Sequence, residues 1–203
     1  MSHGRLFVIS GPSAVGKGTV VNEIMKSSKN VKLSISATTR EPREGETEGV
    51  SYFFMTEEKF KGKAAAGGFL EYANVHGHYY GTPKAPVEES LAAGMDVILE
   101  IDVQGAMKVK ESYGEGTYIF ILPPSLEELR HRIVGRGTEA KEDIELRMGK
   151  AMGEMEYLDR YDYFIVNDEL GETVETLKCI MAAQHQKIDE KSENLLSRYK
   201  EEA

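Results

Sequence analysis

Cysteine is almost absent from this 203-residue chain, in which Cys179 is the single thiol, and tryptophan is absent altogether. One thiol cannot close an intramolecular disulfide, so the fold is expected to depend on an apolar core and to suit a reducing, cytoplasmic compartment. The sequence also lacks an apolar run long enough to span a membrane, and its N-terminus lacks a signal-peptide core. These absences exclude a disulfide framework and lead us to expect no membrane partner.

Positive charge is in deficit, because 25 Lys and Arg residues face 34 Asp and Glu residues, for a net charge of −9. An acidic protein repels phosphate backbones and anionic surfaces, so no nucleic-acid partner is expected. With 40% hydrophobic and 29% charged residues, the composition is that of a globular protein. The length predicts one domain, or one core with inserted lobes.

The stretch from residue 6 to residue 19 is the most informative in the chain. The apolar run 6–9 predicts a buried parallel strand, and helix-compatible residues resume at Thr19. Between them Gly11 and Gly16 bracket four residues, and Lys17 follows at once. Glycines let backbone N–H groups curl around phosphate oxygens, the helix start adds donors, and Lys17 adds a mobile charge. We expect a phosphate-binding loop rather than a structural glycine turn, formed by Gly11, Pro12, Ser13, Ala14, Val15, Gly16, Lys17, Gly18 and Thr19.

Position 18 departs from the usual form of this loop, in which Ser or Thr follows the lysine and ligates a metal. The chain has Gly18 there, so the nearest hydroxyl is that of Thr19. We expect Thr19 to face the metal, with contact through a water molecule as the alternative to direct ligation. The phosphate cradle itself does not need the hydroxyl.

Residues 37–83 are expected to form a small, largely antiparallel lobe inserted into a parallel α/β core. Its polar segment 38–46 carries Arg40 and Arg43, with Pro42 between them. Two arginines on an ordered loop can bind one phosphate, although a solvated charged loop fits this segment as well. Strands are expected at 31–37, 50–55, 69–73 and 78–81, and His76 and His78 are interpreted as surface residues rather than zinc ligands.

A further apolar strand, residues 95–102, carries Glu100 and Asp102 at its C-terminal end. Ligands of open parallel sheets bind beyond the carboxyl ends of the strands, and residues two apart share one face of a strand. A carboxylate at this place can organise magnesium or its waters near the phosphate loop. Capping of the helix that starts near Gln104 is the alternative role.

The last third of the chain predicts a helical hairpin, a strand and a final helix. Ser125 and Glu128 fit a capping box, and glycines flank Arg136 within residues 135–138. The hairpin is expected either to close over transferring phosphates as a lid or to be an ordinary solvated pair of helices. A strand at 163–166 and a helix at 169–190 follow, and the polar tail 191–203 is expected to fray.

Taken in order, these segments resemble guanylate kinases from about residue 4 to residue 184. The resemblance is carried by Gly11-Pro12-Ser13, Gly16-Lys17, residues 36–46 (SATTREPREGE), Tyr52-Phe53-Phe54, Tyr79-Tyr80-Gly81-Thr82, residues 100–105 (EIDVQG) and Arg136-Gly137-Thr138. It implies an α/β fold, the P-loop nucleoside-monophosphate kinase fold, with a central parallel sheet flanked by helices. The core would comprise residues 1–36, 84–124 and 151–190, the GMP-binding lobe 37–83 and the lid 125–150, with a polar tail at 191–203. The implied reaction converts ATP and GMP to ADP and GDP with Mg²⁺, in purine nucleotide metabolism.

The resemblance also implies roles for individual residues. GMP would be bound by Ser36, Arg40, Arg43, Tyr52, Glu71, Tyr80, Thr82, Glu100 and Asp102. The transferred group would be neutralised by Lys17, Arg40, Arg132, Arg136 and Arg147, and ATP would also be contacted by Arg136 and Asn167. A carboxylate such as Glu71 can accept from guanine's adjacent N1–H and amine donors, whereas adenine would leave it unpaired.

Two rival functions are less well supported by the sequence. Guanylate-kinase-like binding modules that do not catalyse have lost the phosphate loop, which is intact here. A related kinase of a phosphorylated ribose would not need Glu71 and Thr82. Ala14, where many relatives have glycine, should cost little unless its φ is positive. The oligomeric state is left open.

Overall fold

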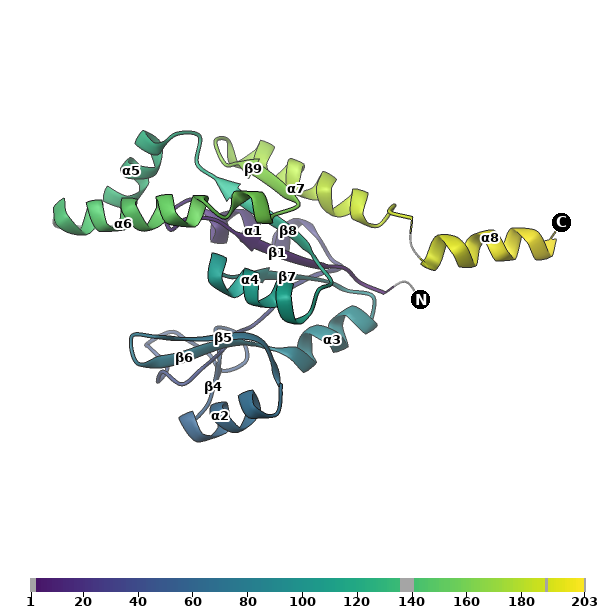
Figure 1. Cartoon of the computed structure of the whole chain (residues 1–203), viewed down its shortest axis with the longest axis horizontal. Helices are drawn as coiled ribbons and strands as arrows, with labels where there is room; N and C mark the ends of the chain where they lie inside the picture. The colour runs from purple at the N-terminus through teal and green to yellow at the C-terminus, as the bar shows by residue number, and fades with distance from the viewer. Residues whose placement is uncertain (1–2, 136–140, 189, 203) are drawn as a thin grey trace.

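The computed structural model describes residues 3–135, 141–188 and 190–202. Its centre is a five-stranded sheet in the order β2-β7-β1-β8-β9, and a second, four-stranded sheet has the order β4-β3-β6-β5 (Figure 1). Every pairing in the central sheet is parallel. Its strands are β1 (Leu6–Ser10), β2 (Val31–Leu33), β7 (Asp96–Glu100), β8 (Thr117–Leu122) and β9 (Tyr163–Val166).

Helices cover both faces of the central sheet, because alternate side chains of each apolar strand point to opposite faces. Phe7 and Ile9 pack against α1 (Lys17–Ser27) and α7 (Leu170–Gln184). Leu6 and Val8 pack against α3 (Lys84–Ala92) and α4 (Val103–Ser112). The expected α/β core is therefore confirmed, and the carboxyl ends of its strands meet at one edge.

The inserted lobe contains β3 (Ala37–Thr38), β4 (Phe53–Phe54), α2 (Glu57–Ala65), β5 (Phe69–Val75) and β6 (His78–Pro83). Its sheet is mixed, since β6 is antiparallel to β3 and β5 while β3 and β4 are parallel. The predicted strand 31–37 is wrong as a single element. It is split at residues 34–36, where the chain leaves the central sheet for the lobe sheet, and the predicted strand 50–55 is shortened to the two residues of β4.

Two helices, α5 (Leu126–Val134) and α6 (Lys141–Met155), form the expected hairpin above the lobe (Figure 1). The Ser125 hydroxyl accepts a hydrogen bond from the Glu128 N–H at 3.0 Å, as the capping box predicts. The Glu128 carboxylate pairs instead with Arg132, at 2.7 Å, so only half of the box forms. A short helix, η1 (Leu158–Arg160), follows α6.

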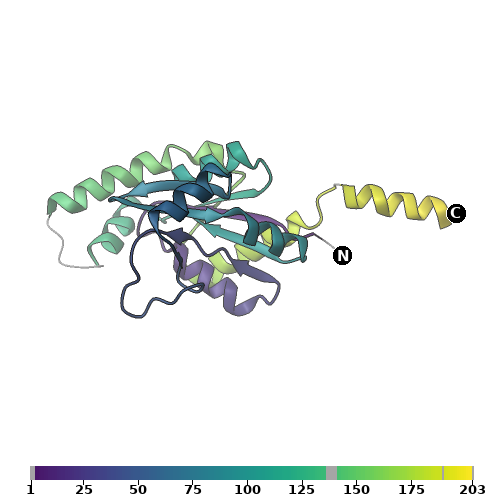
Figure 2. The ribbon, with the colours of Figure 1, turned by 90° about the horizontal axis from the view of Figure 1, so that it is seen from below.

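The C-terminal segment differs from its prediction. Helix α7 ends at Gln184 rather than near residue 190, and the expected frayed tail is helix α8 (Glu190–Glu202). Residues 190–202 contain no proline or glycine and favour helix, although their polarity suggested fraying. Helix α8 extends away from the rest of the molecule (Figures 1 and 2). Across the described ranges, no helix combines the length and apolarity that crossing a membrane requires.

Candidate functional site

The phosphate loop joins the end of β1 to the start of α1. Gly11 and Gly16 have φ of 150° and 96°, and both are crowded. A Cβ on Gly11 would lie 2.3 Å from the Ile121 carbonyl oxygen, so no larger residue fits there. The Lys17 Nζ donates hydrogen bonds to the carbonyl oxygens of Gly11, at 2.6 Å, and Pro12, at 3.1 Å. The ammonium group therefore lies across the loop, close to where an anion would be bound.

Ala14 is the strained residue of this loop. Its φ is 66°, in the left-handed region, which costs a non-glycine residue roughly 1–2 kcal/mol. The sequence predicts that alanine at this position costs stability only if its φ is positive. The φ of Ala14 is positive, so this cost applies. The Ala14 methyl group is buried in an apolar cluster with Leu129, Ile133, Met148 and Ala151 from α5 and α6.

Asn167, predicted to contact ATP, and Arg132, predicted to neutralise the transferred group, both contact the phosphate loop. Asn167 is buried, and its Nδ2 donates to the Val15 carbonyl oxygen at 2.8 Å while its Oδ1 accepts from Thr173 Oγ1 at 3.1 Å. Arg132 Nη1 donates to the carbonyl oxygens of Val15, at 3.3 Å, and Asn167, at 3.1 Å. Both side chains hold the loop from its outer side in this structure.

The two carboxylates at the end of β7 differ in their surroundings. A Cβ on Gly18 would lie 3.4 Å from Glu100 Oε1, so the missing side chain at position 18 leaves room for Glu100 at the start of α1. Burial raises the pKa of Glu100, and the positive charge of Lys17 opposes that rise. Asp102 caps α4, since its Oδ1 accepts from the Gly105 N–H at 2.7 Å. The capping role that the sequence allowed is thus confirmed for Asp102.

No cluster of three or more His, Cys, Asp or Glu side chains within the described ranges has the arrangement of a metal site. Thr19 is exposed, one residue beyond the position that faces Glu100. Successive helical residues point about 100° apart, so Thr19 does not replace the missing hydroxyl on the face towards Glu100. His76 and His78 are exposed, as expected of surface histidines.

The hairpin β5–β6 carries Glu71 and Thr82, two residues predicted to bind guanine. Its two-residue turn, at His76 and Gly77, sets the register that places Glu71 opposite Thr82. Glu71 Oε1 accepts a hydrogen bond from Thr82 Oγ1 at 2.7 Å. Glu71 Oε2 lies 3.3 Å from the position of a Cβ on Gly105, and the Asp102 Oδ1 lies 3.4 Å from it. Burial raises the pKa of Glu71, and Thr82 opposes the rise. Ser36, half-buried between β2 and β3, is not among these contacts.

Arg40 is the centre of the loop predicted to bind the acceptor phosphate. Its Nε donates to the Tyr80 hydroxyl at 3.2 Å, and its guanidinium carbon lies 5.6 Å from the centre of the Tyr52 ring. Its Nη2 donates to both oxygens of Glu46, at 2.8 and 3.0 Å, and the Arg43 N–H donates to Glu46 Oε2 at 2.8 Å. The Arg40 hydrogen bond, together with the Arg43 N–H, lowers the pKa of Glu46. Arg40, Tyr52 and Tyr80 are therefore brought together, with Arg43 joined through its backbone.

The lid arginines are described in part. Arg147 is half-buried on α6, and Arg136 lies outside the described residues. Arg130 joins helices α5 and α6 through a pair of hydrogen bonds with Glu145, the shorter at 2.6 Å.

Sequence reasoning missed two carboxylates at this site, Glu46 and Glu154. Glu46 accepts hydrogen bonds from the Arg40 guanidinium group, as described above. Glu154 lies on α6 beside a cavity of about 330 Å³ that Asp102, Lys150 and Tyr157 also line. No local signal marks Glu154, because its place on a charged helix is typical of a solvated residue, whereas Glu46 lay within the segment already singled out.

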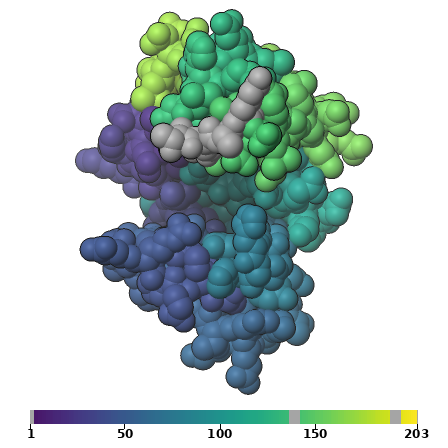
Figure 3. Space-filling model, turned by 90° about the vertical axis from the view of Figure 1, so that its left-hand side faces the viewer, coloured from purple at the N-terminus to yellow at the C-terminus, as the bar shows by residue number. Residues whose placement is uncertain are grey.

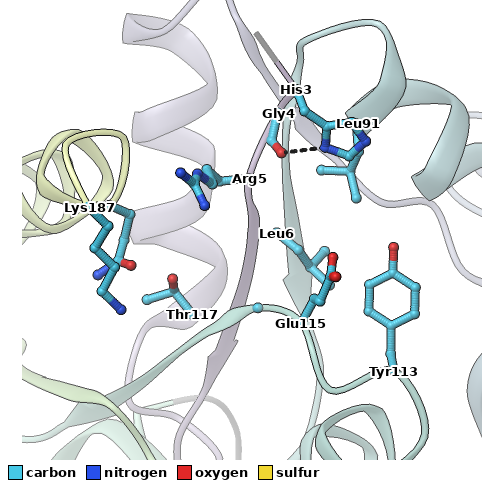
Figure 4. A pocket seen from close by; sticks show the side chains of 11 residues that line it. His3, Gly4, Arg5, Leu6, Leu91, Tyr113, Glu115, Thr117 and Lys187 are labelled. Atoms are coloured by element: carbon cyan, nitrogen blue, oxygen red, sulfur yellow. Dashed lines mark hydrogen bonds between the residues drawn. The ribbon is translucent and has the colours of Figure 1, made fainter. Parts of the chain in front are cut away.

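A hollow lies between the lobe and the hairpin α5–α6, as Figure 3 shows end-on. A second cavity, of about 470 Å³, lies at the opposite end of the strands and is lined in part by His3, Arg5, Leu91 and Tyr113 (Figure 4). Because ligands of parallel α/β sheets bind at the carboxyl ends of strands, the hollow near the phosphate loop is the candidate active site.

Comparison with known proteins agrees with this geometry. The sequence model of the guanylate kinase family matches residues 3–184. A guanylate kinase of Clostridium tetani is 50% identical over 97% of this chain and 94% of its own length. One from Caldanaerobacter subterraneus subsp. tengcongensis is 50% identical over 98% of this chain and 97% of its own. The crystal structure of guanylate kinase from Anaplasma phagocytophilum superposes with a TM-score of 0.71 at 35% identity, covering 92% of this chain and 88% of that one. This chain belongs to the guanylate kinase family.

Proposed function

We propose that this chain transfers the γ-phosphoryl group of ATP to GMP, with Mg²⁺ as the divalent metal. The observation that carries the proposal is the presence, in one chain, of the phosphate loop and of a half-buried Glu71 that is hydrogen-bonded to the buried Thr82. A binding module without activity would not need the loop, and a kinase of a phosphorylated ribose would not need a buried acceptor for a base.

The guanine base of GMP, the phosphoryl acceptor, is recognised by Glu71, Thr82 and Asp102. Guanine presents its N1–H and its exocyclic amine side by side. Glu71 Oε2, the oxygen that is not bonded to Thr82, is the acceptor that these donors require. Both donors favour the ionised carboxylate and so oppose the effect of burial on the Glu71 pKa. Ser36 is assigned to the edge of the same pocket.

The acceptor phosphate is bound by Arg40, Arg43, Tyr52 and Tyr80. Arg40 is held by Tyr80 and Glu46 before any substrate binds, which fixes the direction of its guanidinium group. An arginine whose rotamer is already fixed loses less entropy when it binds an anion. Glu46 also supplies a negative charge that keeps this loop compact while the phosphate is absent.

The donor nucleotide is held by the phosphate loop, with Lys17 at its outer phosphates. The residues present suit magnesium, because Mg²⁺ usually binds through one or two carboxylates, substrate phosphates and several waters. Glu100, which ends β7 and lies beside Gly18 at the start of α1, would hold it through water. The metal would neutralise charge that develops on the phosphates. Lys17, Arg40, Arg132, Arg136 and Arg147 would share that task, although Arg132 would have to exchange its contact with Val15 for one with phosphate.

A coupled assay with a panel of nucleoside monophosphates tests this function. GMP should be phosphorylated well, dGMP is expected to be accepted, and AMP, CMP and UMP should be poor substrates. Activity on AMP equal to that on GMP would refute the assignment of the Glu71 pocket. Omission of magnesium, with EDTA present, should abolish turnover.

A further inference from the structure

The peptide group that joins Val15 to Gly16 in the phosphate loop is anchored by contacts that the proposed chemistry does not use. The Val15 carbonyl oxygen accepts hydrogen bonds from Asn167 Nδ2, at 2.8 Å, and from Arg132 Nη1, at 3.3 Å. The Asn167 amide also lies directly against Gly16, because a Cβ on that glycine would be 2.6 Å from Nδ2. The Val15 side chain is fully buried in the apolar cluster that contains Val174 of α7. The carbonyl end of this peptide group is therefore fixed.

The direction of the Val15 carbonyl decides where the Gly16 N–H points. No peptide bond within the described ranges is cis, and in a trans peptide the C=O and N–H groups point in opposite directions. Because the carbonyl oxygen points towards Asn167, the Gly16 N–H points away from it and can serve the phosphates that the loop is proposed to hold. Glycine lets such a peptide group turn over easily, and the reversed group would present an oxygen that repels phosphate. An anchor on the carbonyl therefore has a use.

Thr173 decides which end of the Asn167 amide faces the loop. Asn167 Oδ1 lies 3.1 Å from Thr173 Oγ1, and both residues are buried. An amide oxygen turned towards the Val15 carbonyl oxygen would place two acceptors 2.8 Å apart, so Nδ2 faces the loop and Oδ1 needs a donor. The Thr173 hydroxyl is that donor. The Glu169 carbonyl oxygen, 3.0 Å from the same hydroxyl, is already satisfied by the Thr173 N–H.

We propose that Thr173 and Asn167 are positioning residues that act in series, holding the Val15–Gly16 peptide group with its N–H directed at the phosphates of ATP. The inference rests on the proposed role of the loop in ATP binding. Asn167 then contributes to ATP binding through the loop, with both polar atoms of its amide engaged by protein groups. Thr173 brings helix α7 into the site from beneath the loop.

The anchor matters most when Arg132 leaves the loop. Arg132 is the second donor to the Val15 carbonyl oxygen, and in the proposed chemistry it exchanges this contact for one with phosphate. Asn167, buried and bonded to Thr173, then keeps the carbonyl in place. Its loss should consequently lower kcat as well as raise the ATP KM.

A direct contact between Asn167 and the adenine base is the rival explanation. Such a contact would affect binding of ATP but not of inorganic tripolyphosphate, which has the phosphates and no base. Positioning of the peptide group affects both ligands by the same factor, because the lost contact is one with phosphate. Packing is the rival explanation for Thr173, and it predicts that the buried methyl group matters and the hydroxyl does not.

The experiment compares Asn167→Ala, Thr173→Val and Thr173→Ser with a control, Thr176→Val, whose exposed hydroxyl donates to the Glu172 carbonyl oxygen of the same helix at 2.8 Å. Affinity for a non-hydrolysable ATP analogue with magnesium is measured by calorimetry. Inhibition by tripolyphosphate, kcat and both KM values are measured in the coupled assay.

Loss of a hydrogen bond that orders the loop should weaken both ligands about tenfold in Asn167→Ala and about fivefold in Thr173→Val. Thr173→Ser keeps the hydroxyl and should bind both ligands within about twofold of wild type, as should the control. The GMP KM should be unchanged in all four variants.

Three outcomes would overturn the inference. Weaker analogue binding by Asn167→Ala with unchanged inhibition by tripolyphosphate would establish a base contact. A serine variant as impaired as the valine variant would establish packing, and a valine variant equal to the control would remove Thr173 from the site. If Asn167→Ala fails to fold, the two Thr173 variants decide, because valine keeps the shape and serine keeps the hydroxyl. A wild-type protein that binds both ligands but does not phosphorylate GMP would refute the proposed function instead, leaving the comparison of affinities valid.

Discussion

Substitution of Glu71 by glutamine removes one acceptor from the proposed guanine pocket at nearly constant shape. In the present structure Glu71 Oε1 is engaged by Thr82 Oγ1 at 2.7 Å, and Oε2 faces the start of α4. If glutamine keeps its oxygen towards Thr82, its NH₂ group faces guanine donors. If it turns over, the Thr82 hydroxyl can accept instead, and one neutral oxygen remains for two donors.

Either orientation loses at least one charge-assisted hydrogen bond in a buried site. Such a bond contributes about 1.5–3 kcal/mol, and the donor left unpaired adds to the loss. We therefore expect the activation free energy for kcat/KM with GMP to rise by about 2–4 kcal/mol. This rise corresponds to a fall in kcat/KM of roughly 30-fold to 1000-fold. The ATP KM should change less than about twofold, since the phosphate loop lies outside this pocket.

Stability gives an independent check on the Glu71 substitution. Burial raises the folded-state pKa of Glu71 above its unfolded value, so ionising this side chain opposes folding. Stability of the substrate-free wild type should consequently fall as pH rises through the folded pKa of Glu71, and the glutamine variant should lack this component. At neutral pH the variant should unfold at the same temperature as the wild type or slightly above it. An unchanged kcat/KM for GMP in the folded variant would refute the assignment of Glu71 to the base.

Four further substitutions test other parts of the site. Lys17→Ala should lower kcat at least about a hundredfold, because the ammonium group lies where phosphate charge develops. The unfolding temperature should not change. Turnover within a few-fold of wild type would contradict this role of Lys17. Replacing Arg40 or Arg43 by lysine should raise the GMP KM far more than the ATP KM, because lysine cannot donate two parallel hydrogen bonds, and equal changes in both KM values would point to misfolding of the lobe. Ala14→Gly should change the free energy of unfolding by less than about 1 kcal/mol, because relief of the left-handed strain offsets loss of a buried methyl group. A loss above about 2 kcal/mol in urea unfolding would show that packing outweighs strain at this position.

Local signals allowed much of this site to be predicted. The phosphate loop is continuous in sequence, and the caps at Asp102 and Ser125 need only a hydroxyl or carboxylate three residues before an N–H. Even the Glu71–Thr82 contact follows from a two-residue hairpin turn.

Features that depend on distant partners could not be predicted in the same way. Residues 34–36 show no proline or glycine, yet the chain crosses there from one sheet to the other, because strand pairing is decided by tertiary context. The backbone of Ala14 is likewise set by its surroundings and not by its own preference.

The inserted lobe has an aromatic centre of its own, in which the Phe60 ring stacks on Phe69 at 4.4 Å and on Tyr79 at 5.3 Å between ring centres. This packing does not draw on the apolar clusters of the central sheet. In the proposed function, nucleobase choice resides in the inserted lobe and phosphoryl-donor chemistry in the core, and Leu70 of β5 joins the two by packing in the cluster that contains Leu6 and Val8. Natural selection, or a protein engineer, can rebuild the hairpin that carries Glu71 and Thr82 for another base while the catalytic loop stays untouched.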